Sequence, residues 1–164
     1  MYKELETERL RIRPINVTDA AFIKELVNSK GWLKFIGDKN ISTIIDAERY
    51  IQKILDNPHF YYSIFELKTS GEPIGIVTFL NRENQNFPDI GFALLPDFEK
   101  NGYTIEAIKK YIEALLGLGI HKKIIAITLP NNHKSIKLLT KLGLNYEYDF
   151  EKEGETLSLF SLSL

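Results

Sequence analysis

The stretch that decides the fold is residues 89–107, which read DIGFALLPDFEKNGYTIEA. Its first part, 90–95, is a short apolar run that stops at Pro96, a pattern typical of a buried strand. Gly102 then precedes apolar residues at helical spacing, which are Ile105, Ile108, Ile112 and Leu115. The spacing therefore predicts a strand, a short loop and a helix in immediate succession.

The loop of this unit is a candidate phosphate-binding site. The first N–H groups of a helix have no partner within the helix, and the helix dipole places positive charge beside them. Asn101 and Gly102 supply the flexible backbone that a loop around an anion needs. An ordinary turn between strand and helix also accounts for a single glycine, so the loop alone leaves both interpretations open.

The segments that follow extend this unit into a sheet. Residues 124–127 (IIAI) form an unbroken apolar run, which suits a strand covered on both faces, as in a parallel pair. A helix is predicted over roughly 132–142, and Gly143 is its natural end. The tail, 146–162, predicts two strands around a turn at Glu153-Gly154.

The segments before residue 89 predict strands on either side of two helices. The strands are expected at residues 8–13, 60–67 and 74–80, the last two as a hairpin. Thr18-Asp19 and Ser42-Thr43 each precede an amphipathic helical pattern, and an aromatic-rich loop is expected at residues 31–38 between them. The order β-α-α-β-β-β-α-β-α-β-β predicts a mixed α/β fold.

Composition narrows the class of protein. The 164 residues are 44% hydrophobic and 26% charged, as in a globular protein, and we expect one domain spanning 1–164. A net charge of −1 offers no electrostatic basis for binding nucleic acid. No signal peptide and no apolar run of about 18 residues is seen, so a cytoplasmic protein without a membrane partner is expected. There is no cysteine, and the scattered histidines predict no metal site: His59, His121 and His133.

Three segments carry a resemblance to a known family. They are residues 6–15 (ETERLRIRPI), then 90–96 (IGFALLP) with Gly102-Tyr103 and Glu106-Ala107, then 128–132 (TLPNN) with 135–143 (SIKLLTKLG). In this order they resemble the GCN5-related N-acetyltransferase (GNAT) superfamily, and within it the ribosomal-protein N-terminal, or RimJ/RimL-type, branch. The resemblance covers nearly the whole chain.

The resemblance implies a mostly antiparallel central sheet with a splayed parallel strand pair and flanking helices. It also implies that acetyl-coenzyme A (acetyl-CoA) lies in that splay, without a metal, with its pyrophosphate at residues 99–104 and its thioester near Leu94. Backbone amides of the 92–95 strand would hold the pantetheine, and one would polarise the acetyl carbonyl. The implied cofactor-binding residues are Phe92, Ala93, Leu94, Leu95, Glu99, Lys100, Asn101, Gly102, Tyr103, Thr104, Asn132 and Ser135.

Two catalytic residues are implied by the resemblance. Asp89 matches an acidic position that could deprotonate the amine, although a solvated Asp at the start of a strand, or one in a salt bridge, would look the same. Ser135 matches a hydroxyl that could approach the leaving thiolate, although it could instead bond locally within its helix. Asn132 matches an Asn near the pantetheine and also reads as a helix N-cap.

The loop departs from the family pattern at three positions. Glu99 brings negative charge to a phosphate site, Lys100 stands where a glycine is common, and Thr104 adds bulk. We expect Lys100 to face the phosphates and Glu99 to turn toward solvent or a basic neighbour.

The predicted function is transfer of an acetyl group from acetyl-CoA to a primary amine, either a protein N-terminus or a small molecule. The alternative is a catalytically silent module of the same fold that binds a small ligand or protein. A homodimer is one candidate assembly. Four aromatic residues could line an acceptor groove or belong to the core: Trp32, Phe35, Tyr61 and Tyr62.

Overall fold

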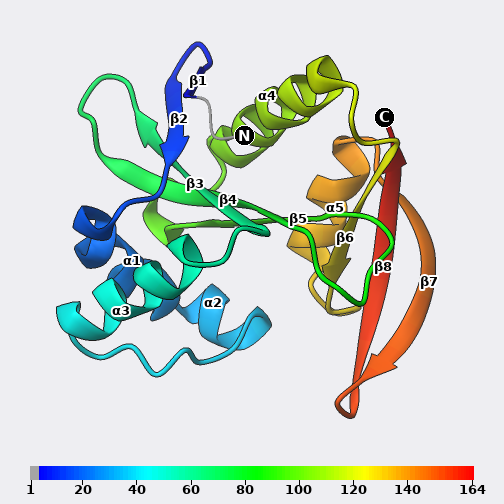
Figure 1. The fold of residues 1–164 in the computed structure, drawn as a ribbon, viewed down its shortest axis with the longest axis horizontal. Helices are drawn as coiled ribbons and strands as arrows, with labels where there is room; N and C mark the ends of the chain where they lie inside the picture. The colour runs from blue at the N-terminus through cyan, green and yellow to red at the C-terminus, as the bar shows by residue number, and fades with distance from the viewer. Residues whose placement is uncertain (1–3) are drawn as a thin grey trace.

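The computed structural model describes residues 4–164, built around one eight-stranded sheet in the order β1-β2-β3-β4-β5-β6-β8-β7 (Figure 1). Its strands are β1 (Leu5–Glu6), β2 (Leu10–Pro14), β3 (Phe60–Leu67), β4 (Pro73–Leu80), β5 (Asp89–Leu94), β6 (Lys123–Thr128), β7 (Asn145–Lys152) and β8 (Glu155–Ser163). Neighbouring strands are antiparallel except β5 and β6, which are parallel. The predicted fold class is confirmed.

Helices cover both faces of this sheet and bury an apolar cluster on each. They are α1 (Ala20–Val27), α2 (Lys30–Phe35), α3 (Ile44–Leu55), α4 (Tyr103–Leu118) and α5 (His133–Lys141). Figure 1 shows α1, α2 and α3 gathered on one side of the sheet and α4 on the other. Ile108 of α4 belongs to one cluster with Phe79, while Ile51 of α3 belongs to the other with Ile76. Each such buried side chain contributes about 1.5–3 kcal/mol of hydrophobic stabilisation.

β5 contributes to both clusters because successive side chains of a strand point to opposite faces. Ile90 is buried in the α4 cluster, and Phe92 and Leu94 pack against that cluster. On the opposite face, Ala93 packs against the cluster beneath α1 and α3, in which Leu95, just beyond the end of β5, is buried. This alternation holds β5 between the two helical layers, at the centre of the molecule.

The helix and turn boundaries follow most of the predicted signals. Thr43 caps α3 in a capping box with Asp46. Gly143 ends α5 with φ +88°, a left-handed conformation that favours glycine. Ahead of α1, Asp19 occupies the predicted N-cap position but makes no side-chain cap hydrogen bond. A 3-10 turn, Val17–Asp19, precedes it, and its capping residue is Asn16, whose side chain accepts the Thr18 N–H.

Two elements were not expected. Residues 31–38 were predicted as a loop, but α2 runs through Lys30–Phe35 and buries Trp32 against the α1–α3 cluster. Glycine and aromatic residues are poor helix formers, so local propensity hid this short helix, which tertiary packing stabilises. The two-residue strand β1 is too short to show periodicity. None of the helices in residues 4–164 has the length and apolar character needed to cross a membrane.

Candidate functional site

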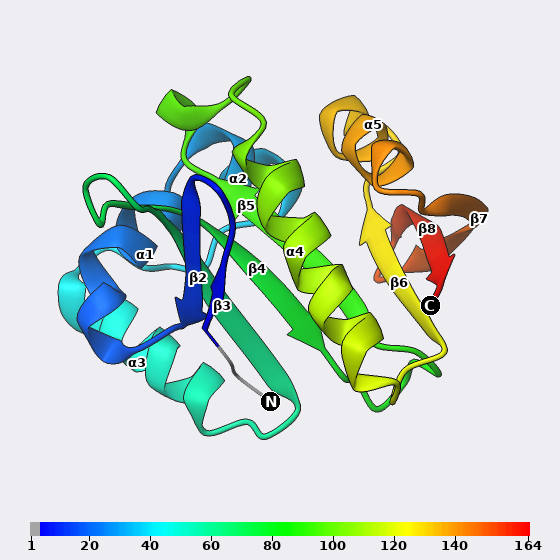
Figure 2. The same cartoon turned by 90° about the horizontal axis from the view of Figure 1, so that it is seen from above.

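β5 and β6 pair at one position and then diverge. Among the described residues the register between them contains the single pair Asp89 and Ile125, where the Ile125 N–H donates to the Pro88 carbonyl at 2.9 Å. Both strands continue beyond this pair, to Leu94 and Thr128, and Figure 2 shows them separating in that direction. This divergence, called the splay below, is the predicted opening of the parallel pair.

The splay leaves backbone groups of β5 free along one edge. The Leu95 N–H donates to the Ile74 carbonyl at 2.9 Å, and the register of β5 with β4 continues from there, so Leu95 and Ala93 direct their backbone groups toward β4. Alternate residues of a strand direct these groups to opposite sides. The N–H and C=O groups of Phe92 and Leu94 therefore face the splay, and the amide of Leu95 does not.

The loop between β5 and α4, residues 99–104, forms a backbone cradle at the open end of β5. Lys100 and Gly102 both have left-handed φ values, +67° and +78°. The Asn101 side chain holds this shape by donating to the carbonyls of Phe98, at 3.1 Å, and Glu99, at 3.0 Å. Within residues 4–164 we find no acceptor for the N–H groups of residues 100–105. Clustered free N–H groups at a helix N-terminus attract anions.

A segment far away in sequence clamps this cradle. The Glu106 carboxylate, in the first turn of α4, accepts the Thr7 hydroxyl at 2.6 Å and the Arg9 Nε–H at 2.7 Å. Arg9 also donates from Nη1 to the Asn101 carbonyl at 3.0 Å and lies 4.5 Å from the centre of the Tyr103 ring. The hydrogen bonds from Thr7 and Arg9 outweigh partial burial and lower the pKa of Glu106, so its charge is compensated.

The Glu99 side chain contacts a basic residue outside the loop, as expected. Its carboxylate lies 2.6 Å from Lys134 Nζ at the start of α5, so Glu99 turns to a basic neighbour. Lys100, Asn101 and Gly102 are exposed, Tyr103 is half-buried and Thr104 is buried. The bulk of Thr104 is therefore accommodated in the protein interior instead of filling the cradle.

α5 presents the other two predicted cofactor-binding residues. The Asn132 Oδ1 accepts the Ser135 N–H at 3.3 Å, which confirms Asn132 as the N-cap of α5. Ser135 is half-buried. The ion pair from Glu99 to Lys134 joins this end of α5 to the loop of residues 99–104, so both lie at the open end of the splay. Figure 2 shows α4 and α5 on either side of that end.

Asp89 lies at the closed end of the splay, where the two strands still pair. It is buried, with 9% of its surface exposed, and its carboxylate is 3.4 Å from Arg82 Nε. Burial raises the pKa of Asp89 to about 6, although the Arg82 charge and hydrogen bond oppose this change. The salt bridge foreseen as an alternative exists, and the carboxyl group also has a pKa suited to accepting a proton near neutral pH.

The four aromatic residues separate by face. Trp32 is buried beneath α1–α3, and its Nε1 has no partner within the described residues. Tyr62 packs on the same side and is hydrogen-bonded to Tyr50, and burial raises the pKa of both phenols. Tyr61 packs on the α4 side, 6.5 Å from Phe79 between ring centres. Phe35, the last residue of α2, is half-buried. The predicted set is therefore divided between the two faces of the sheet.

Sequence reasoning missed three charged residues of this site. Arg9 stands inside the quoted segment 6–15, so its motif was visible although its contact with Glu106 was not. Arg82 and Lys134 carry no local signal, because each acts through a partner placed by the fold.

Comparison with known proteins places these features in a family. The model of the acetyltransferase (GNAT) domain matches residues 9–145, which include β5, the loop, α4 and α5. The uncharacterised N-acetyltransferase YoaA of Bacillus subtilis is 28% identical over 162 residues, covering 94% of this chain and 86% of its own.

Two solved structures share the fold. RimL, a ribosomal alpha-N-protein acetyltransferase in complex with coenzyme A, superposes with a TM-score of 0.86 at 14% identity, over 99% of this chain and 98% of its own. The microcin self-immunity acetyltransferase MccE, in complex with acetyl-CoA and AMP, superposes with a TM-score of 0.84 at 18% identity, over 96% and 94%. With a family match over most of its length, this chain belongs to the GNAT acetyltransferases, which are acetyl-CoA-dependent enzymes.

Proposed function

We propose that this protein transfers the acetyl group of acetyl-CoA to a primary amine by direct attack of the amine on the thioester. The observation that carries the proposal is the free edge of β5. There the Phe92 and Leu94 backbone groups face a splay with the N–H cradle at its open end and a buried carboxylate at its closed end. The residues proposed for phosphate binding, pantetheine binding and proton transfer thus follow one another from the open end of the splay to its closed end.

The residues at the open end fit the cosubstrate. Six N–H groups, from residues 100 to 105, have no acceptor within the described chain and are suited to a pyrophosphate. The left-handed Gly102 has no side chain between the backbone and the anion, and an added Cβ would lie 3.6 Å from Arg9 Nη2. Phe92 and Leu94 would hydrogen-bond the pantetheine as a neighbouring strand does. Asn132 and Ser135 border the same opening from α5.

Asp89 is the proposed general base. An amine attacks only as the free base, so its ammonium form must first lose a proton, directly or through water, to the Asp89 carboxylate. The free amine attacks the thioester carbon to give a tetrahedral intermediate, and its collapse breaks the C–S bond. The proposed donor to the leaving thiolate is the Ser135 hydroxyl, which is restored, directly or through water, by the proton that the amide nitrogen loses. A backbone N–H of β5 stabilises the negative charge that develops on the carbonyl oxygen.

The alternative of a catalytically silent module rested on Glu99 and Lys100. Glu99 is paired with Lys134, and the cradle can bind an anion through backbone groups alone. We therefore favour the enzyme over the silent module.

A titration tests the cosubstrate first. Acetyl-CoA should raise the melting temperature of the wild type, because a ligand that binds only the native state stabilises it. Gly102→Asp should abolish most of that rise, and Gly117→Ala, at a helical glycine with open space around it, is the matched control. Release of free thiol is then followed with a panel of amines. A thermal shift without thiol release for any amine would favour the silent module.

A further inference from the structure

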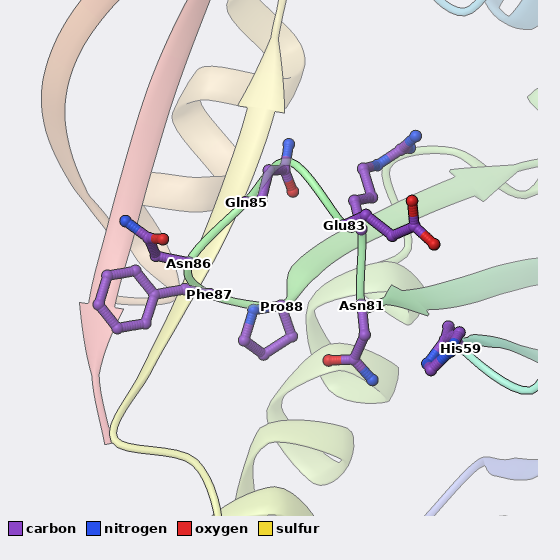
Figure 3. Close-up of a pocket in the computed structure, with 8 residues that line it drawn as sticks. His59, Asn81, Glu83, Gln85, Asn86, Phe87 and Pro88 are labelled. Carbon is purple, nitrogen blue, oxygen red and sulfur yellow. The ribbon is translucent and has the colours of Figure 1, made fainter.

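A pocket of about 240 Å³ adjoins the proposed base. It is lined by residues 81–83 and 85–88 of the connection between β4 and β5, together with His59. Figure 3 shows this connection as an arch, with Asn81 and Glu83 on one arm and Phe87 and Pro88 on the other. Asp89 follows the arch directly in sequence, so whatever binds in the pocket lies next to the closed end of the splay.

Arg82 links the pocket to the base. It lines the pocket, and its Nε is the atom that faces the Asp89 carboxylate, at 3.4 Å. Its guanidinium carbon lies 6.0 Å from the centre of the Phe60 ring. Within residues 4–164 no acceptor is found for its two terminal nitrogens, Nη1 and Nη2, and 40% of its side-chain surface is exposed. One end of the guanidinium is therefore engaged and the other is available.

A second group in the pocket lacks a partner. Gln85 lines the pocket, and its Oε1 atom is buried without a hydrogen-bond donor within the described residues. A buried carbonyl oxygen without a donor is unfavourable, so such a group calls for a ligand N–H or O–H. The pocket thus offers free cationic donors from Arg82 and a free acceptor from Gln85.

We infer that the amine acceptor is an amino-acid-like molecule that carries a carboxylate next to its amine, and that Arg82 selects it. The inference rests on the proposed function. Nη1 and Nη2 of Arg82 would bind the carboxylate in the bidentate geometry that guanidinium favours. Because the Nε of the same guanidinium holds Asp89, the neighbouring amine is delivered to the base. Gln85 Oε1 would accept a hydrogen bond from an N–H of the acceptor.

A protein N-terminus has no carboxylate next to its amine, because the carbonyl beside that amine belongs to a neutral peptide bond. The free terminal nitrogens of Arg82 would then face no charge. A free amino acid is thus the acceptor that satisfies both unpartnered groups of the pocket.

The test compares L-amino acids with their carboxamides, which lose the negative charge; because the amine of a carboxamide also has a lower pKa, rates are compared at equal concentrations of the free-base amine. Rates of thiol release are measured at about pH 8.5, well above the pKa of about 6 that Asp89 has in the wild type, so that its carboxyl group is ionised there. The wild type should prefer the acids over the amides in kcat/KM by at least about tenfold. Arg82→Gln should remove the preference, mainly through KM of the acids, and Arg82→Lys should keep part of it.

Controls separate recognition from folding. Arg49→Gln removes an exposed arginine on α3 and should leave the ratio of acids to amides unchanged. The melting temperature and the acetyl-CoA response of Arg82→Gln show that this variant folds and binds its cosubstrate. Equal rates for acids and amides in the wild type, or activity on peptide N-termini alone, would overturn the inference and leave the proposed function standing. No thiol release with any amine would overturn both.

Discussion

Lys134 Nζ lies 2.6 Å from Glu99 Oε2, and this ion pair bridges the open end of the splay from α5 to the loop before α4. Both side chains are partly exposed, so the pair contributes little to stability. Its effect is instead on the charge around the backbone cradle, because Lys134 offsets the negative charge of Glu99, the residue just before the free N–H groups of residues 100–105.

The first prediction concerns this pair. Glu99→Gln should leave acetyl-CoA binding unchanged or tighten it, because a carboxylate that repels phosphate is lost while Lys134 remains. Lys134→Gln should weaken binding, and more strongly at low salt, where screening is least. Calorimetric titration at low ionic strength and at about 0.15 M salt measures both effects. Weaker binding by Glu99→Gln would mean that the pair is needed to shape the loop.

The second prediction concerns the backbone at Lys100. Its φ of +67° is unfavourable for a residue with a Cβ, whereas glycine adopts it readily. Lys100→Gly should therefore raise the free energy of unfolding, measured with urea, by roughly 0.5–1 kcal/mol. This net value allows for the greater flexibility of glycine in the unfolded chain, which opposes the gain. Lys100→Ala removes the same charge and keeps the strained backbone. Equal stabilisation by both variants would assign the effect to charge.

The third prediction concerns the rate. If Asp89 is the base, thiol release with an amine should rise with pH through about 6, the pKa of its carboxyl group, and then level off wherever deprotonation by Asp89 limits the reaction. Asp89→Asn should lower the rate by about 100-fold or more, with little change in acetyl-CoA affinity. An unchanged rate between about pH 6 and 9 in this variant would assign Asp89 a structural role.

The fourth prediction concerns stability. The pKa of Asp89 is raised by burial to about 6, above the value of about 3.9 in an unfolded chain. Between these values the folded protein binds more protons, so the stabilisation from Asp89 is complete below about pH 4 and is lost as pH rises through 6. The difference in unfolding free energy between Asp89→Asn and wild type should shift in favour of Asn by on the order of 2 kcal/mol from pH 4 to 7. No shift would indicate an ordinary pKa.

Local patterns predicted the parts of the site that depend on local structure. The apolar run before Pro96, Gly102 and the helical spacing after it identified β5, the loop and α4, and Asn132 was recognised as a cap from its place before α5. Each of these signals arises within a few residues along the chain, which is the range over which backbone geometry acts.

Contacts between segments far apart in the sequence could not be predicted from local patterns. Glu99 and Lys134 are 35 residues apart, and Thr7 and Glu106 are 99 apart, so no periodicity connects them. The expectation that the 92–95 amides act together also needed the register of β4: the Ile74 carbonyl occupies the Leu95 N–H and leaves Phe92 and Leu94 to face the splay. A buried carboxyl such as Asp89 likewise depends on what the fold packs around it.

The central claim is that acetyl-CoA binds along the free edge of β5, and amide hydrogen exchange tests it residue by residue. Adding acetyl-CoA should slow exchange at Phe92 and Leu94, whose N–H groups face the splay, and at the loop amides of residues 100–105. The Leu95 amide, already bonded to Ile74, is the internal control and should change little. Protection at these positions supports the account; binding that leaves Phe92 and Leu94 unprotected would contradict it.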